Sequence, residues 1–123
     1  MKKQTKQDLI KILNRKKGTF KWLKFPNKSN KSTYFTNKFI DYEIMPQCDT
    51  RNKYFVIELI RPEFRKKPEI RIGYYIIGKK PSVAGKWVWG QFAPMIPQKD
   101  VSGIFKRIQT LIKRFNKNKL GNC

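Results

Sequence analysis

Two tryptophans, Trp87 and Trp89, stand two residues apart in the stretch GKWVWGQFAPMIPQKD at residues 85–100. In a β-strand this spacing puts both indole rings on one face of the sheet. Rings on a covered face are core residues, whereas rings on an open face beside lysines and arginines offer a surface on which unpaired nucleobases stack while the cations bind phosphates. The sequence leaves both alternatives open, and the register of this strand decides between them.

The charge of the chain is large and unevenly placed. The 123 residues include 29 Lys and Arg against 8 Asp and Glu, with no histidine, for a net charge of +21. Residues 1–38 hold twelve basic side chains and one acid, and residues 98–123 hold seven and one. Solubility alone is served by a net charge of about 2 to 8 in a small domain. The excess predicts a polyanionic partner, most often nucleic acid.

The sequence offers little for catalysis. It has no histidine for acid–base chemistry, no Walker glycine loop, no G-x-S-x-G elbow and no cysteine pair at metal-ligand spacing. Asp41, Glu43 and Glu58 could together hold a magnesium ion, but acids on the wet face of a strand more often serve only solvation. We therefore expect no enzyme, no catalytic or metal-binding residues, no cofactor and no small-molecule substrate.

Cysteine content and hydropathy bear on location. The two cysteines are Cys48 and Cys123, the polar opening MKKQTKQD lacks the apolar core of a secretory signal, and no apolar run approaches the ~20 residues of a membrane span. These observations predict a cytoplasmic protein without a membrane partner.

Hydrophobic periodicity predicts a helix followed by four strands. Thr5 and Asp8 fit a capping box ahead of the apolar stretch at residues 9–13. Residues 19–25 alternate only partially, and residues 27–38 have the Asn, Ser and Lys content of a loop or an edge segment. Strict alternation then predicts strands, at residues 39–45, 54–61, 70–80 and 86–93. Their short connections favour an antiparallel meander.

A closing amphipathic helix follows Pro97 and Asp100, which suit a first helical turn. Its apolar positions trace one face, at Val101, Ile104, Phe105, Ile108, Leu111, Ile112 and Phe115. Such a face packs on the sheet. The predicted fold class is α+β: a four-stranded antiparallel meander (ββββα) with the closing helix on one face, preceded by a short N-terminal helix. Residues 1–38 form a basic N-terminal arm and residues 39–123 the ββββα part of one globular domain.

The other face of the predicted sheet has nothing to cover it except the N-terminal 38 residues or a second copy of the chain. In one register Val88 and Phe92 lie beneath the closing helix, in a layer with Ile40, Ile44, Ile57, Leu59, Ile72 and Ile76. The tryptophans then lie on the open face with Asp41, Glu43 and Glu58, whose charges weaken it for anions. The expected nucleic-acid-binding residues on or beside that face are Arg71, Tyr75, Lys79, Lys80, Lys86, Trp87 and Trp89.

The order of these elements resembles the single-stranded-DNA-binding transcriptional regulator fold of the Whirly proteins and of the coactivator called positive cofactor four. The stretch GKWVWGQFAPMIPQKD is similar to a segment of small uncharacterised cyanobacterial proteins with that fold. The resemblance covers about residues 36–116 and rests on element order and this one stretch. It implies subunits that assemble through their sheets and bases that stack on exposed strands.

Together these features predict a protein that binds single-stranded nucleic acid, DNA or RNA, with little sequence preference, and that forms a homodimer through its uncovered sheet face or edge. The alternative is a basic adaptor subunit that docks on an acidic protein complex, for which exposed tryptophans and arginines are equally suited.

Overall fold

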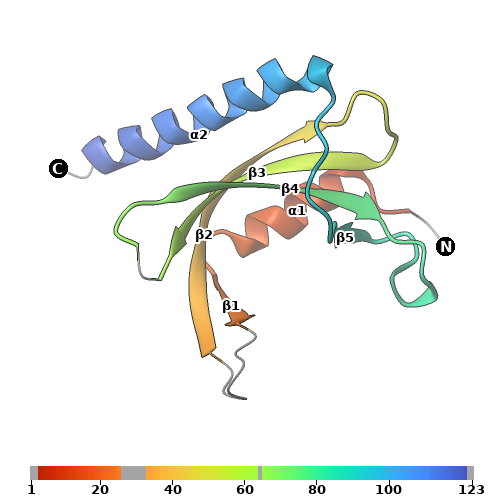
Figure 1. Cartoon of the computed structure of the whole chain (residues 1–123), viewed down its shortest axis with the longest axis horizontal. Coiled ribbons are helices and arrows are strands. Elements are labelled where there is room, and N and C mark those ends of the chain that lie inside the picture. Colours follow the sequence, from red (N-terminus) through yellow and green to blue (C-terminus); the bar gives the residue numbers. More distant parts are fainter. Residues whose placement is uncertain (1–2, 26–32, 64, 122–123) are drawn as a thin grey trace.

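The computed structural model describes residues 3–25, 33–63 and 65–121 and confirms the predicted order of helix, meander and closing helix (Figure 1). The elements are helix α1, strands β1 to β5 and helix α2, with two single-turn 3-10 helices, η1 and η2. Their bounds are α1 Lys6–Lys16, β1 Phe20–Phe25, β2 Thr33–Pro46, β3 Lys53–Pro62, β4 Glu69–Ile77, η1 Pro81–Val83, β5 Trp87–Trp89, η2 Gln98–Asp100 and α2 Val101–Gly121. The strands form one sheet in the order β1-β2-β3-β4-β5, with every neighbouring pair antiparallel.

The sheet is one strand larger than the predicted meander. The partially alternating residues 20–25 form β1, which pairs with the first half of β2 from Phe20 opposite Lys38 to Phe25 opposite Thr33. Residues 33–38, expected in a loop or an edge segment, belong to β2, and residues 26–32 lie outside the described residues. At the other edge β5 has three residues, shorter than the predicted strand at 86–93.

Helix α1 covers the second face of the sheet, so of the two covers considered, the N-terminal residues and a second copy, the structure has the first. Thr5 caps it, since its hydroxyl accepts from the Asp8 N–H while the Asp8 carboxylate accepts from the Thr5 N–H, which is the predicted capping box. Leu9 and Leu13 are fully buried and pack with residues of the sheet, namely Phe39, Val56, Ile60, Tyr75 and Trp87. The start of the basic N-terminal arm is therefore part of the core.

Helix α2 packs on the opposite face (Figure 1), where buried Ile104 and Leu111 meet Phe55, Ile57 and Tyr74. The predicted apolar stripe of this helix is wider than the surface that the sheet covers. Its remaining side chains at Val101, Phe105 and Ile112 are 53%, 60% and 42% exposed.

The register assigns several residues to faces other than those predicted. Ile44 lies opposite Val56 and packs on the α1 side, so its placement beneath the closing helix was wrong. A β-bulge between Phe39 and Asp41 shifts the phase of β2, so Asp41 and Glu43, expected on the open face, instead bind Arg114 of α2. Phe92, also expected beneath α2, is 80% exposed.

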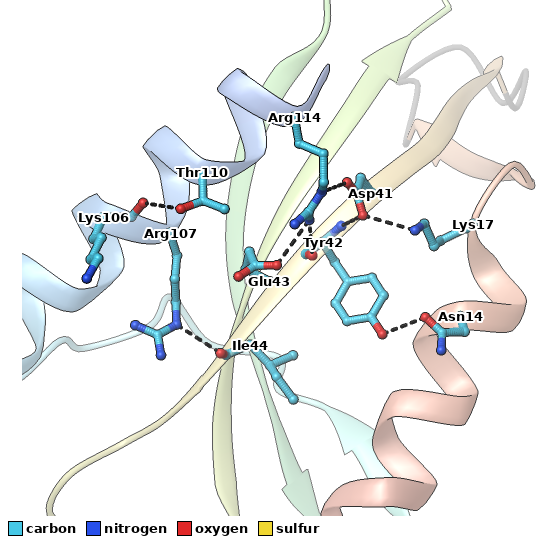
Figure 2. A network of polar contacts seen from close by, with 10 residues as sticks. All are labelled: Asn14, Lys17, Asp41, Tyr42, Glu43, Ile44, Lys106, Arg107, Thr110 and Arg114. Carbon is cyan, nitrogen blue, oxygen red and sulfur yellow. Dashed lines mark hydrogen bonds and ion pairs between the residues drawn. The ribbon is translucent and has the colours of Figure 1, made fainter. Parts of the chain in front are cut away.

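Polar contacts fasten both helices to β2 (Figure 2). Arg114 of α2 donates to the Asp41 carboxylate at 2.7 Å and to the Glu43 carboxylate at 3.0 Å. Lys17, just after α1, forms an ion pair with the other Asp41 oxygen at 3.2 Å. The Tyr42 hydroxyl donates to Asn14 Oδ1 of α1 at 2.6 Å. One strand thus positions α1 on one face of the sheet and α2 on the other.

Candidate nucleic-acid interface

Trp87 is a core residue. Its side chain is 7% exposed, and its ring contacts Tyr54 edge-on with centroids 5.5 Å apart. The indole N–H donates to the Thr5 carbonyl at 2.8 Å, and the backbone N–H of Trp87 donates to Gln4 Oε1 at 2.7 Å. The segment that leads into α1 therefore covers this ring, and the expectation that Trp87 stacks on a base from an open face fails.

Trp89 lies on the same face of β5 but is only half-buried. Its ring lies over Gly73 of β4, where an added Cβ would stand 2.1 Å from the indole, so only glycine leaves this space free. Tyr75 meets the ring edge-on, with centroids 5.3 Å apart, and the Arg71 guanidinium lies 5.3 Å from the ring centroid, within cation–π range. Two of the predicted residues, Arg71 and Tyr75, thus both contact the ring of a third, Trp89.

These three residues line a hollow of about 240 Å³ beside the C-terminal end of α1. We call it the α1-side hollow; its other described lining residues are Lys16, Thr19, Phe20, Asn37, Phe39, Glu58 and Ile60. Its wall therefore combines aromatic rings with two cations and one acid.

The charges of the α1-side hollow are partly matched. Glu58 is 2% exposed and accepts from Arg71 Nε at 2.7 Å. Lys16 Nζ donates to the Tyr75 hydroxyl and lies 5.1 Å from the centroid of its ring. Burial lowers the pKa of the Lys16 ammonium below its usual value, although Glu58 opposes this shift. Burial also raises the pKa of Tyr75 to about 12, with Glu58 adding to the effect, so Tyr75 is neutral at physiological pH.

Asn37 adds an unused acceptor to the same wall. The residue is 7% exposed, and its buried side-chain oxygen Oδ1 has no hydrogen-bond partner. Buried polar atoms are nearly always paired, so this oxygen is available to a hydrogen-bond donor that enters the hollow.

The predicted lysines do not join this hollow. Lys79 and Lys80 follow β4 and Lys86 precedes β5, and all three are exposed. Lys79 and Lys80 line a second hollow of about 550 Å³ with Val88 and Phe92, and Trp89 lines both hollows. Lys79 and Lys80 thus add positive charge beside Trp89, but outside the α1-side hollow.

Lys16 and Asn37 were missed by sequence reasoning. Lys16 is 59 residues from its partner Tyr75, and nothing in the local pattern of the first helix distinguishes it from Lys11 or Lys17. Asn37 stood in the stretch expected as a loop or an edge segment. The packing of α1 across the sheet brings Lys16 to the site, and the pairing of β2 with β3 brings Asn37.

The three carboxylates considered as magnesium ligands do not form one site. Asp41 and Glu43 bind Arg114 on the α2 side, whereas Glu58 binds Arg71 on the α1 side. In the part of the chain that the structure describes, no group of three His, Cys, Asp or Glu side chains gathers at a distance suited to a metal. Neither of the two described helices is long and apolar enough to cross a membrane.

No family model matches the sequence, and comparisons with curated proteins and with solved structures found no match either. The resemblance to the single-stranded-DNA-binding regulators therefore stays a prediction.

Proposed function

We propose that this protein binds single-stranded nucleic acid and that the α1-side hollow receives one unpaired base. The observation that carries the proposal is the convergence of Trp89 and Tyr75 with Arg71 and Lys16 around one small hollow. Aromatic faces beside cations are what an unpaired nucleotide requires, and stacking on such a ring is worth about 1–3 kcal/mol per base.

The charge of the whole chain supports a polyanion as the ligand. Several acids serve the fold: Asp8 caps α1, Asp41 and Glu43 bind Arg114, and Glu58 binds Arg71. Many of the 29 basic residues lie on the surface, among them Lys3, Lys6, Lys11, Arg15, Arg51, Lys79, Lys80, Lys86 and Lys106. Phosphates along a strand would contact these side chains with little regard to sequence.

The size of the hollow favours a base over a larger ligand. Sites for drug-sized molecules usually occupy about 300–1,000 Å³, and the α1-side hollow has about 240 Å³. A base inside a duplex hides both of its faces, so the strand must be unpaired. The free Asn37 Oδ1 would accept a hydrogen bond from an amino or imino group of the base.

Fluorescence anisotropy with a labelled oligonucleotide of ~20 to 30 nucleotides tests the proposal. We expect tighter binding of the single strand than of its duplex, with log K falling against log salt by about 0.7 per phosphate contacted. Binding should quench tryptophan emission, and Trp89→Phe should remove part of that quenching. Equal affinity for single strand and duplex would contradict the proposal.

A matched pair of variants separates the hollow from general charge. Lys16→Gln and Lys11→Gln remove the same charge from the same helix, but only Lys16 lines the hollow, whereas Lys11 is exposed. We expect Lys16→Gln to weaken single-strand binding several-fold more than Lys11→Gln, with both variants folded by circular dichroism. Equal losses of affinity would show that binding depends on the overall positive charge and not on the hollow.

The exposed part of the α2 stripe favours the adaptor as the second candidate function. Val101, Phe105 and Ile112 present apolar surface with Lys106 and Lys113 further around the helix, and Lys66 and Lys67 line a hollow with Ile112. An acidic amphipathic helix of a partner protein fits apolar surface flanked by lysines. Binding of such a peptide to the wild type and to Phe105→Ser tests this candidate.

The proposed location of the protein is the cytoplasm, because the chain contains only two cysteines and disulfide-rich proteins belong to oxidising compartments.

A further inference from the structure

Two cations face each other across β2 and β3. Lys38 lies directly opposite Arg61 in the antiparallel pair, so both side chains leave the sheet on the same face. Like charges at directly opposite positions destabilise a sheet. An anion that binds between the two cations reduces their repulsion.

A third cation lies at the same place. Lys38, Arg61 and Lys66 line a hollow of about 620 Å³ near the C-terminal end of α2, together with Gly18, Ile40, Pro68, Phe115 and Asn118. We call it the β2–α2 hollow. Among its described lining residues there is no Asp or Glu. The nearby Asp41 is held by Lys17 and Arg114.

We propose that the β2–α2 hollow is a phosphate-binding site, in which Arg61 forms paired hydrogen bonds to phosphate oxygens and Lys38 and Lys66 supply further positive charge. A guanidinium matches the geometry of two phosphate oxygens, and an ammonium acts as a compact charge beside it. Asn118 adds a polar side chain at the rim.

The source of the phosphate that we infer is the backbone of the strand whose base enters the α1-side hollow, so the inference rests on the proposed function. Residues 18–20 and 37–39 connect the two hollows, since Gly18 and Lys38 line one while Thr19, Asn37 and Phe39 line the other. Phe20 lines the α1-side hollow and is 57% exposed, and Lys38 Nζ lies 5.9 Å from its ring centroid. A strand that passes this aromatic ring would reach both sites.

Thermal melts with inorganic phosphate test the site without a nucleic acid. We expect phosphate, compared with chloride at equal ionic strength, to raise the melting temperature of the wild type and of Lys11→Gln by the same few degrees. In Lys38→Gln and Arg61→Gln the rise should fall to less than half. Each variant is compared with itself, so a change in its own stability does not affect the result. If phosphate raises the melting temperature of all four proteins equally, the β2–α2 hollow is not a phosphate-binding site.

Oligonucleotide titrations then identify the source of the phosphate. Each of Lys38→Gln and Arg61→Gln should lower the slope of log K against log salt by about 0.7, the value for one phosphate contact on a single strand. If the strand binds all variants with the wild-type slope, the inference is wrong while the proposed function stands. If phosphate stabilises through Lys38 and Arg61 but no strand binds, the proposed function fails and the site is one for a free phosphate compound.

Discussion

Trp87 and Trp89 share one face of β5, yet only Trp87 is enclosed, because the residues before α1 pass over it. Gln4 and Thr5 accept its two N–H groups, and the backbone N–H of Gln4 donates to the Gly85 carbonyl at 2.8 Å. At the scale of single residues, Trp87 holds the residues before α1 against the sheet through hydrogen bonds, whereas Trp89 lines the α1-side hollow.

Trp87→Ala should lower the free energy of unfolding by about 3–5 kcal/mol, the usual cost of removing a large buried aromatic ring. Urea denaturation followed by circular dichroism measures the change. Phe92→Ala is the matched control, because Phe92 is 80% exposed and surface substitutions usually stay within about 0.5 kcal/mol. Similar losses in the two variants would show that Trp87 is not part of the core.

At the scale of elements, the sequence predicted the order of most helices and strands. It did not predict which side of each strand lies on which face of the sheet. The capping residues of α1 and the alternation within the central strands were readable because they are local signals. Alternation divides one strand into two faces, but it does not say which face continues onto the next strand when both are apolar. Here both are apolar because a helix covers each, and for this reason Ile44 was assigned to the wrong side.

The candidate site was only partly predictable for a related reason. Arg71, Tyr75 and Trp89 fall on one face through the period of two and the pairing of Tyr75 with Trp89. The chemistry around them also depends on Lys16 and Asn37, which come from elements far away in the chain. No pattern within a helix or a strand encodes such a contact.

Asp41 is the residue through which both helices are fastened to β2 (Figure 2). Burial opposes ionisation of its carboxyl, but hydrogen bonds from Arg114, from the Tyr42 N–H and from Lys17 outweigh burial, so the pKa of Asp41 is lowered. A carboxyl with a lowered pKa stabilises the fold at pH above its unfolded value of 3.8, and this contribution is lost as pH falls through the lowered value.

Asp41→Asn should therefore destabilise the protein by about 1–3 kcal/mol at neutral pH. The difference from the wild type should begin to shrink as the pH falls below 3.8, where the unfolded carboxyl takes up a proton, and should be lost as the pH falls through the lowered pKa and the folded carboxyl also becomes neutral. Urea denaturation across this pH range measures it. Glu69→Gln is the control, since Glu69 and its partner Arg65 are both largely exposed and such pairs contribute about 0–1 kcal/mol. A difference that stays constant with pH would show that charge on Asp41 is not the cause.

At the scale of the whole molecule, a helix covers each face of the sheet. A second copy of the chain therefore cannot bind on an open sheet face. The homodimer was expected from an uncovered sheet face or edge; α1 covers that face, and β1 and β5 are the edge strands of the described sheet. The exposed large apolar side chains of the described residues include three on α2, at Val101, Phe105 and Ile112. A second copy that packed there would bring its own lysines against Lys106 and Lys113, whereas an acidic partner would be attracted to them.

Phe105→Ser decides which protein, if any, occupies this surface. Phe105 is 60% exposed, so we expect the variant to keep the wild-type melting temperature within a few degrees. An acidic amphipathic helical peptide should bind the wild type and bind Phe105→Ser at least several-fold more weakly, with Phe92→Ser unchanged as the control, because Phe92 is exposed elsewhere. Light scattering should give a monomer for all three proteins. A wild-type dimer that Phe105→Ser converts to a monomer would instead assign the stripe to a second copy of the chain, and the loss of peptide binding would then report competition for the same residues.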